Sequence, residues 1–300
     1  MVHKVRSFNR TVTQRIGALQ DEYLASGRPL GASRLLWEIG EGTTDVRSLR
    51  ARLDLDSGYL SRLLRSLEEE GLVAGEPDAA DRRVRRVRLT AAGEREHGLL
   101  DARSDDLARS VLGTLRPTDQ ERLVDAMDVV TRLLTAGLVE IAVEDPRSEA
   151  ARFCLRSYFA ELDARFHTGF DPGRSLPFDA AEMTAPAGLI LLARLHDEPV
   201  GCGGLRFAEG RPALIKRMWV SPTARGLGVG RRLLTELEHH ATERGSTRIQ
   251  LDTNGTLHEA IGLYRSSGYV EVEPFNDEPY ADHWFEKRLG GRVRRRSRAG

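Results

Sequence analysis

The feature that most constrains the fold is the stretch KRMWVSPTARGLGVGRRLL, over residues 216–234. The pattern predicts a short apolar strand over 215–220, a turn, a glycine-rich loop and then a helix. Gly226, Gly228 and Gly230 carry no Cβ, so the backbone can curl and approach a ligand closely. The following helix adds the positive end of its dipole, and the stretch therefore predicts a phosphate-binding loop.

A dinucleotide-binding loop is the first alternative for this stretch. That fingerprint needs G-x-G-x-x-G directly after its strand. Here Arg231 occupies the third glycine position, and five residues separate the strand from the loop. The spacing therefore argues against a Rossmann loop, although a domain with a chance glycine loop remains a second alternative.

The order of motifs resembles the acyl-coenzyme A site of GNAT-type N-acetyltransferases. Arg225-x-x-Gly228-x-Gly230 follows an M-W-V strand, and the strand RIQLDT is followed by Asn254 and by a helix that carries Tyr264. The resemblance covers about the last half of the chain. It implies an α/β (α+β) acetyltransferase fold, acetyl-coenzyme A (acetyl-CoA) as cofactor, and transfer of an acetyl group to an amine.

The resemblance also implies roles for single residues. Backbone N–H groups of the loop would hold the pyrophosphate, and the strand around Met218 would pair with the pantetheine arm. Asn254 would hydrogen-bond that arm. The expected cofactor residues are Met218, Trp219, Val220, Arg225, Gly226, Leu227, Gly228, Val229, Gly230, Arg231, Asn254 and Tyr264.

Tyr264 occupies the position where this family usually has its general acid. A phenol with a pKa near 10 stays protonated at neutral pH and can still protonate a leaving thiolate. The alternative is that Tyr264 only packs beside Leu263. The general base stays open, because Ala213 and Leu214 stand where many relatives have a glutamate; Glu182, Glu209 and Asp252 are equal candidates.

The acceptor pocket is expected between the first helix of this fold and the segment before its last strand. Its candidate residues are Tyr158, Arg165, Phe170, Asn276 and Tyr280. Aromatic walls with one arginine suit a small, amino-acid-like amine that bears a carboxylate. The same side chains would also serve as ordinary core and rim.

The first half of the chain has the periodicity of helices. Apolar spacing predicts helices over 3–25, 30–40 and 46–53, the first with one buried face. Ser57 is predicted to cap a fourth helix, GYLSRLLRSLEEE, with Leu60, Leu63, Leu64 and Leu67 buried. A hairpin over 72–89 follows, and it carries five arginines between Arg82 and Arg88.

This helix-turn-helix with an arginine-tipped wing, followed by LTAAGE, resembles the MarR family of winged-helix repressors over about residues 1–138. The resemblance implies a palindromic DNA operator, and a homodimer in which helices over about 92–112 and 118–134 join the first helix. A solvated edge strand is the alternative for the arginine run. The expected DNA-binding residues are Ser57, Tyr59, Ser61, Arg62, Arg65, Asp81, Arg82, Arg83 and Arg85, of which Asp81-Arg82-Arg83 matches the family's wing D-x-R.

The length and the charge of the chain are consistent with two domains. The 300 residues suggest a winged helix-turn-helix domain over 1–138, an acetyltransferase domain over 139–290 and a basic tail over 291–300. With 45 basic and 45 acidic residues the net charge is zero, so the protein as a whole does not attract DNA. DNA would have to bind to a local patch of positive charge. Two cysteines, no apolar run of membrane length and no signal peptide favour a cytoplasmic protein. The histidines lack ligand spacing, so no metal is expected.

Three functions remain open from the sequence. The chain is a bifunctional regulator and acetyltransferase of a small amine, or a regulator whose second domain only senses acetyl-CoA, or an enzyme whose winged helix serves only for dimerisation. Tyr264 with the glycine loop favours the first function over the second, and the wing favours it over the third.

Overall fold

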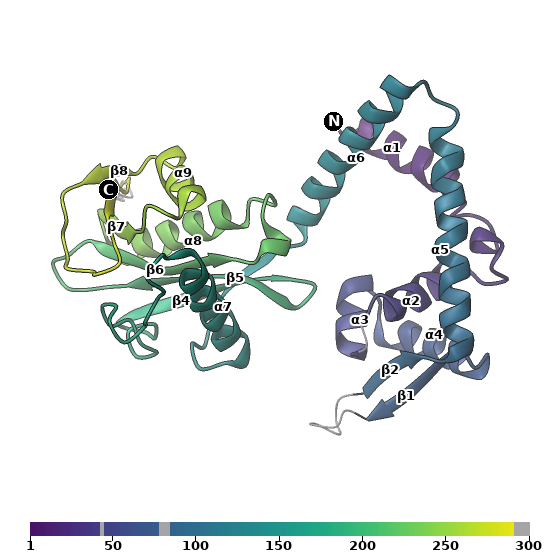
Figure 1. Ribbon diagram of the computed structural model, residues 1–300, viewed down its shortest axis with the longest axis horizontal. Helices are drawn as coiled ribbons and strands as arrows, with labels where there is room; N and C mark the ends of the chain where they lie inside the picture. Colours follow the sequence, from purple (N-terminus) through teal and green to yellow (C-terminus); the bar gives the residue numbers. More distant parts are fainter. Residues whose placement is uncertain (43–44, 78–84, 291–300) are drawn as a thin grey trace, which may run out of the picture. The chain divides into compact units, whose positions relative to one another are not determined.

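The computed structural model describes residues 1–42, 45–77 and 85–290 (Figure 1). The chain divides into two compact units, Met1–Val129 and Val130–Gly300, and the division lies inside helix α6. The predicted wing residues Asp81, Arg82 and Arg83 and the basic tail over 291–300 lie outside the described residues. Across the described ranges, no helix is both long enough and apolar enough to cross a membrane.

The first unit is a helical domain with one β-hairpin. Its core joins Leu35 and Leu36 to the leucine stripe of the fourth helix, so the predicted burial of Leu60, Leu63, Leu64 and Leu67 is confirmed. The elements are α1 (Val2–Arg15), a 3-10 turn (Tyr23–Ala25), α2 (Leu30–Gly40), α3 (Val46–Leu53), α4 (Ser57–Glu69), β1 (Val73–Pro77), β2 (Arg85–Leu89), α5 (Ala91–Leu112) and α6 (Pro117–Gly137).

Three sequence predictions for this unit are wrong: the length of the first helix, its buried face and the cap of α4. Helix α1 ends at Arg15 instead of running to residue 25, and the backbone turns at Gly17, whose φ is 69°. Helix α1 buries none of its side chains among the described residues, so the predicted buried face is not seen. The cap of α4 is Asp56 and not Ser57: the Asp56 carboxylate accepts a hydrogen bond from the Tyr59 N–H at 2.9 Å.

The second unit is a seven-stranded mixed sheet with helices on both faces (Figure 1). The strand order is β3-β4-β5-β6-β7-β9-β8, and only β6 and β7 pair in parallel. Its elements are β3 (Glu140–Glu144), α7 (Glu149–Arg165), β4 (Gly188–Leu195), β5 (Glu198–Arg206), β6 (Ala213–Val220), a 3-10 turn (Pro222–Ala224), α8 (Val229–Glu243), β7 (Arg248–Thr253), α9 (His258–Ser266), β8 (Val270–Val272) and β9 (His283–Arg288). The short strand β8 was not predicted.

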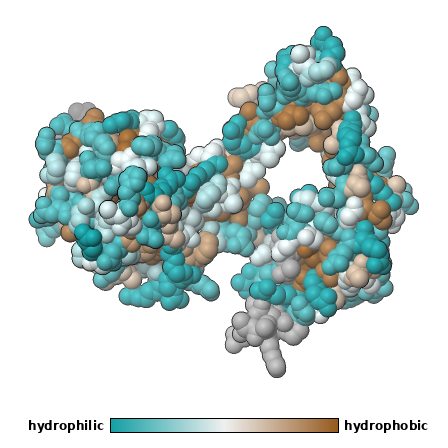
Figure 2. All heavy atoms as spheres, in the orientation of Figure 1, coloured by the Kyte–Doolittle hydropathy of each residue, from teal (hydrophilic) through white to brown (hydrophobic). Residues whose placement is uncertain are grey.

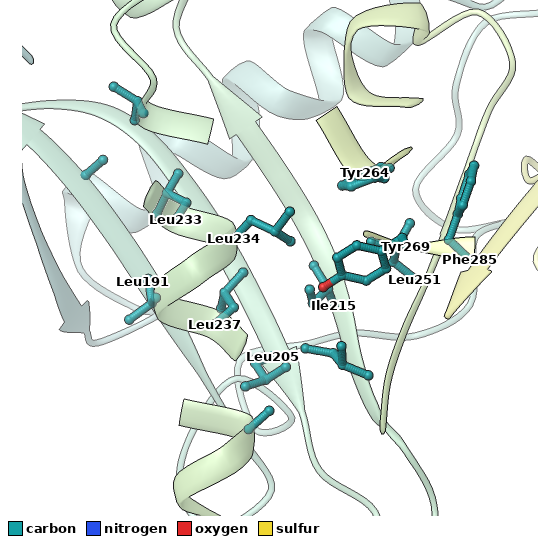
Figure 3. Close-up of a cluster of buried hydrophobic side chains, with 14 of the residues drawn as sticks. Leu191, Leu205, Ile215, Leu233, Leu234, Leu237, Leu251, Tyr264, Tyr269 and Phe285 are labelled. Carbon is teal, nitrogen blue, oxygen red and sulfur yellow. The ribbon is translucent and has the colours of Figure 1, made fainter. Parts of the chain in front are cut away.

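Alternating side chains of β4 separate two cores on the two faces of the sheet. Leu191 belongs to the core under α8, which also contains Tyr264 and Phe285 (Figure 3). Ile190 and Leu192 belong to the core under α7. The sheet is therefore covered on both faces, and register shifts occur in the β4–β5 pair and in the β5–β6 pair.

Candidate active site

The strand β6 leaves its neighbour β7 halfway along its length. Its register with β7 runs from Ala213 to Ile215 only. Just beyond, its register with β5 shifts, and Arg217 takes a φ of 59°, which is uncommon for a residue other than glycine. Such a bulge bends a strand and redirects its side chains, so the second half of β6 splays away from β7.

Two adjoining cavities lie where the strands separate. The larger, about 550 Å³, is lined by the glycine loop and is called the loop groove below. The smaller, about 70 Å³, lies toward β7 and the segment before β9, and is called the polar chamber. Both cavities are lined by Tyr158, Leu162, Met218, Leu257, Ala260 and Tyr264. These six residues form the boundary between the groove and the chamber.

The loop has the backbone conformation that a phosphate site needs. Gly226 and Gly228 have φ values of 80° and 75°, in the left-handed region that favours glycine. Helix α8 begins directly after Gly228 without a side-chain cap, so its first N–H groups are available to an anion. A Cβ on Gly230 would come within 3.3 Å of the Leu263 side chain. The donor set fits the diphosphate of a coenzyme.

Ten of the twelve predicted cofactor residues line the loop groove. Leu227 does not: it packs against the core under α8. Asn254 lines the polar chamber instead, where its amide donates to the Tyr280 carbonyl at 2.8 Å and its oxygen accepts from Thr256. The ten are Met218, Trp219, Val220, Arg225, Gly226, Gly228, Val229, Gly230, Arg231 and Tyr264.

A carboxylate that the sequence reasoning missed organises one wall of the groove. Glu161 of α7 accepts from Arg225 Nη2 at 2.6 Å, from Trp219 Nε1 at 3.0 Å and from Arg165 at 2.9 Å. Arg165 also pairs with Glu259. Arg165 follows Glu161 by four positions, a spacing that brings two side chains together on a helix. This spacing was the one sign of the Glu161–Arg165 pair in the sequence. Arg165 therefore lies at the groove and not with the predicted acceptor residues.

Tyr264 lies at the boundary between groove and chamber and is only 5% exposed. Its ring packs near those of Tyr269 and Phe285, whose centres are each 6.0 Å from the Tyr264 ring centre (Figure 3). Burial raises the pKa of Tyr264 well above the ordinary value, because the phenolate would lose its hydration. The side chain thus packs in the core, as the alternative reading held, while also lining both cavities as a protonated phenol.

Three of the five predicted acceptor residues come together in the polar chamber: Tyr158, Phe170 and Tyr280. Phe170 and Tyr280 are in ring contact at 4.8 Å, and the Tyr280 hydroxyl accepts from the Asp171 N–H. Asn276 is not among the lining residues. It supports the chamber from behind, donating to Asp252 at 2.9 Å and accepting from Trp284 at 2.8 Å.

The sequence analysis also missed the contacts between charged side chains in the polar chamber. Lys216 Nζ lies 3.1 Å from Asp252 and 2.8 Å from Glu278, and all three side chains are at least nine-tenths buried. Of the candidate bases, only Asp252 lines the chamber. Glu182 pairs with Arg206, and Glu209 lines a separate cavity. Lys216 and Glu278 are 62 positions apart, so no local pattern announces their contact.

The predicted recognition helix α4 presents a polar face in the first unit. Ser57, Ser61, Arg62 and Arg65 are exposed as expected. Tyr59 is half-buried against the core and was wrongly placed outward. Arg85, which begins β2, is exposed, although it pairs with Glu68 of α4 at 2.6 Å.

Comparisons with known proteins agree with both units. The model of the acetyltransferase (GNAT) family matches residues 155–269, and a winged helix DNA-binding domain model matches residues 34–93. An "IAA acetyltransferase" of Azospirillum brasilense is 34% identical over 143 residues, which cover 47% of this chain and 90% of that protein. An uncharacterised N-acetyltransferase of Schizosaccharomyces pombe is 34% identical over 96 residues, 31% of this chain and 59% of that protein. A solved GNAT-family acetyltransferase of Staphylococcus aureus has a TM-score of 0.44 at 19% identity, covering 51% of this chain and 99% of that one.

Proposed function

Because the chain belongs to the GNAT acetyltransferase family, we propose that it transfers the acetyl group of acetyl-CoA to a small amine bound in the polar chamber. The observation that supports this most strongly is the position of Tyr264. A buried, protonated phenol lines both the cavity that fits a coenzyme and the cavity that fits an acceptor. A proton donor belongs at that boundary, where acyl transfer expels a thiolate.

Different residues of the loop groove bind different parts of acetyl-CoA. The backbone N–H groups of Gly226, Gly228 and the first turn of α8 hold the diphosphate, and Arg231 adds positive charge. Acetyl-CoA supplies the thioester. The exposed half of β6 at Met218 offers backbone groups to an extended arm, as an added strand does. Tyr264 holds the proton that the thiolate takes.

The aromatic wall of the polar chamber is the observation on which a small-molecule acceptor rests. The cavity is about 70 Å³ and is bounded by the rings of Tyr158, Phe166, Phe170 and Tyr280. Phe166 and Phe170 make further ring contacts with Tyr280, which closes this side. A polypeptide would have to displace these rings.

The first unit is a winged helix DNA-binding domain, and we propose that it acts as a MarR-like regulator. Helix α4 would enter the major groove with Ser57, Ser61, Arg62 and Arg65 outward. A homodimer on a palindromic operator is supported by the apolar faces of α1 and α6, which bury no side chain in this chain (Figure 2). Exposed on them are Val2, Val5, Phe8, Val124, Met127 and Val129.

Two assays on the purified chain test the two halves of the proposal. In the first, acetyl-CoA is mixed with a panel of small amines and free coenzyme A is followed; turnover is expected with at least one amine. In the second, a labelled DNA fragment from upstream of the coding sequence is titrated at low salt. Binding that weakens as salt rises is expected. Lysine peptides that react while every free amine fails would overturn the small-molecule acceptor.

A further inference from the structure

Four charged side chains converge on the polar chamber. Lys216 and Arg217 come from β6, Asp252 from β7, and Glu278 from the segment before β9. None of the four side chains is more than 8% exposed. Buried charges are costly unless each polar atom has a partner, so the partners of every atom matter here.

Most of these atoms have their partners within the protein. Asp252 binds Lys216 with one oxygen and Asn276 with the other. One oxygen of Glu278, Oε2, accepts from Lys216 at 2.8 Å, from Ser175 at 3.0 Å and from the Leu176 N–H at 3.1 Å. These contacts tie β6, β7 and the segment before β9 together.

Within these four charged residues, two buried side-chain atoms have no hydrogen-bond partner among the described residues. They are Oε1 of Glu278, a hydrogen-bond acceptor, and Nε of Arg217, a donor. The Arg217 guanidinium lies over the Phe159 ring at 4.9 Å and over the Tyr158 ring at 5.9 Å, which fixes its position. A buried polar atom left without a partner is costly, so we expect a bound ligand to supply a partner for both atoms.

We propose that Glu278 and Arg217 are the specificity residues of the acceptor site, and that the acceptor is a small amino-acid-like zwitterion. Its ammonium group meets Oε1 of Glu278, which takes the proton that the amine must lose before it attacks the thioester, and its carboxylate meets the Arg217 guanidinium. Arg217 thus takes the role that the sequence suggested for Arg165, which is bound to Glu161 and Glu259 in the loop groove. This inference rests on the proposed acetyl transfer and specifies its substrate class.

The charge balance of the chamber favours a zwitterion over a simple cation or anion. Two cations, Lys216 and Arg217, face two carboxylates, Asp252 and Glu278, so the described chamber is neutral. An amine without a carboxylate would satisfy Glu278 and leave Nε of Arg217 without a partner beside an added positive charge. A carboxylate without an amine would do the reverse. Only a ligand with both groups satisfies both atoms.

The test uses matched trios of acceptors. L-alanine, L-methionine and L-phenylalanine are each compared with the corresponding amide and decarboxylated amine, by release of coenzyme A and by calorimetry without acetyl-CoA. In the wild-type protein, at least one acid should be preferred over its amide and amine by roughly 10- to 100-fold in kcat/KM. The substitution Arg217→Met should bring that preference close to one, mainly through KM.

The variants separate binding from folding. Glu278→Gln should weaken acid binding roughly tenfold in calorimetry, and Arg217→Lys should recover part of the acid preference. Arg211→Met, at an exposed arginine before β6, serves as the control and should keep the wild-type preference. Thermal unfolding of each variant identifies loss of fold. If Glu278→Gln is unfolded, the acid preferences of Arg217→Met and Arg217→Lys test the proposal.

Each outcome of this experiment bears on a different claim. Turnover of plain amines or polyamines with no preference for any acid would overturn the zwitterion, while the acetyltransferase function would stand. An acid preference that survives Arg217→Met would overturn the assignment of Arg217. Tight binding of an acid without any release of coenzyme A would keep this inference and overturn the proposed reaction. Absence of both binding and turnover would overturn both.

Discussion

Arg225 of the glycine loop is held by Glu161 of α7 through contacts of 2.6 Å to both carboxylate oxygens. One guanidinium of the groove that contains the proposed diphosphate site is therefore neutralised by a carboxylate in the same groove. A bound diphosphate would compete with Glu161 for Arg225, and Glu161 would repel it.

We expect Glu161→Gln to strengthen coenzyme A binding. The amide keeps the shape of the side chain and can still accept from Trp219, but the repulsion is removed and Arg225 is released. The dissociation constant should fall about two- to fivefold, as for a partly exposed ion pair. Calorimetry with coenzyme A measures this, with Glu236→Gln on the exposed face of α8 as the control. Unchanged or weaker binding would show that the pair only supports the fold.

Where a part of the site depends on a local sequence pattern, it could mostly be predicted from the sequence. The glycines of the loop and the leucine stripe of α4 follow from spacing, because a turn or a helix brings neighbours in sequence together, and Tyr264 follows from the family resemblance of the motif that carries it. Asp56 and Ser57 show the limit of this reasoning: both residues are good helix caps, and only the backbone decides between them.

The contacts that could not be predicted join residues far apart in the chain. Glu161 meets Arg225 across 64 positions, and Lys216 meets Glu278 across 62. Such contacts are set by how β6 splays, and the bulge at Arg217 has no sequence signature, since it is not a glycine. The prediction of a buried face on α1 failed for another reason: apolar spacing predicts a face that can be buried, but it does not show that a partner surface is present, and α1 buries no side chain among the described residues.

Dimerisation should depend on the apolar face of α6. We expect Met127→Glu to give a monomer at micromolar concentration, because Met127 is exposed in the single chain and a buried charge would be costly in an interface. Sedimentation velocity measures the change. Asp128→Asn, next to it and also exposed, should leave the assembly unchanged. A wild-type protein that is already monomeric would contradict the proposed homodimer.

Operator binding should depend on the exposed arginines of α4. We expect Arg65→Ala to weaken binding and to reduce the slope of log affinity against log salt by about one, as for the loss of one phosphate contact. Arg156→Ala, at an exposed arginine of α7, should leave both values unchanged. Fluorescence anisotropy at several salt concentrations provides both values. If the slope is the same in Arg65→Ala and in the wild type, α4 does not make the expected phosphate contact.

Alkaline pH should destabilise the second unit through its buried tyrosines. Burial raises the pKa of Tyr158 to about 12 and raises those of Tyr264 and Tyr269 further. In the unfolded chain these phenols ionise near pH 10. Their contribution to the free energy of unfolding is therefore intact below about pH 10 and is lost progressively above it, by up to about 1.4 kcal/mol per pH unit for each tyrosine.

Denaturant unfolding at pH 8, 9.5 and 11, with tyrosinate absorbance of the folded protein, measures this loss. Three of the six tyrosines should resist ionisation until the protein unfolds. The Tyr264→Phe variant should show a shallower decline in the free energy of unfolding. If all six phenols titrate together near pH 10 in a protein that stays folded, the tyrosines are not buried as described.

The most direct measurement of the proposed reaction compares steady-state kinetics of the wild type and Tyr264→Phe, with calorimetry for coenzyme A. Phe keeps the ring near those of Tyr269 and Phe285 and removes the proton. If Tyr264 protonates the thiolate, kcat should fall roughly 10²–10⁴-fold while coenzyme A affinity stays unchanged. Between pH 7 and 9.5 the wild type should show no alkaline loss of kcat from Tyr264, because its raised pKa keeps the phenol protonated. A kcat for Tyr264→Phe within about threefold of wild type would show that Tyr264 only packs, and would contradict its role as general acid.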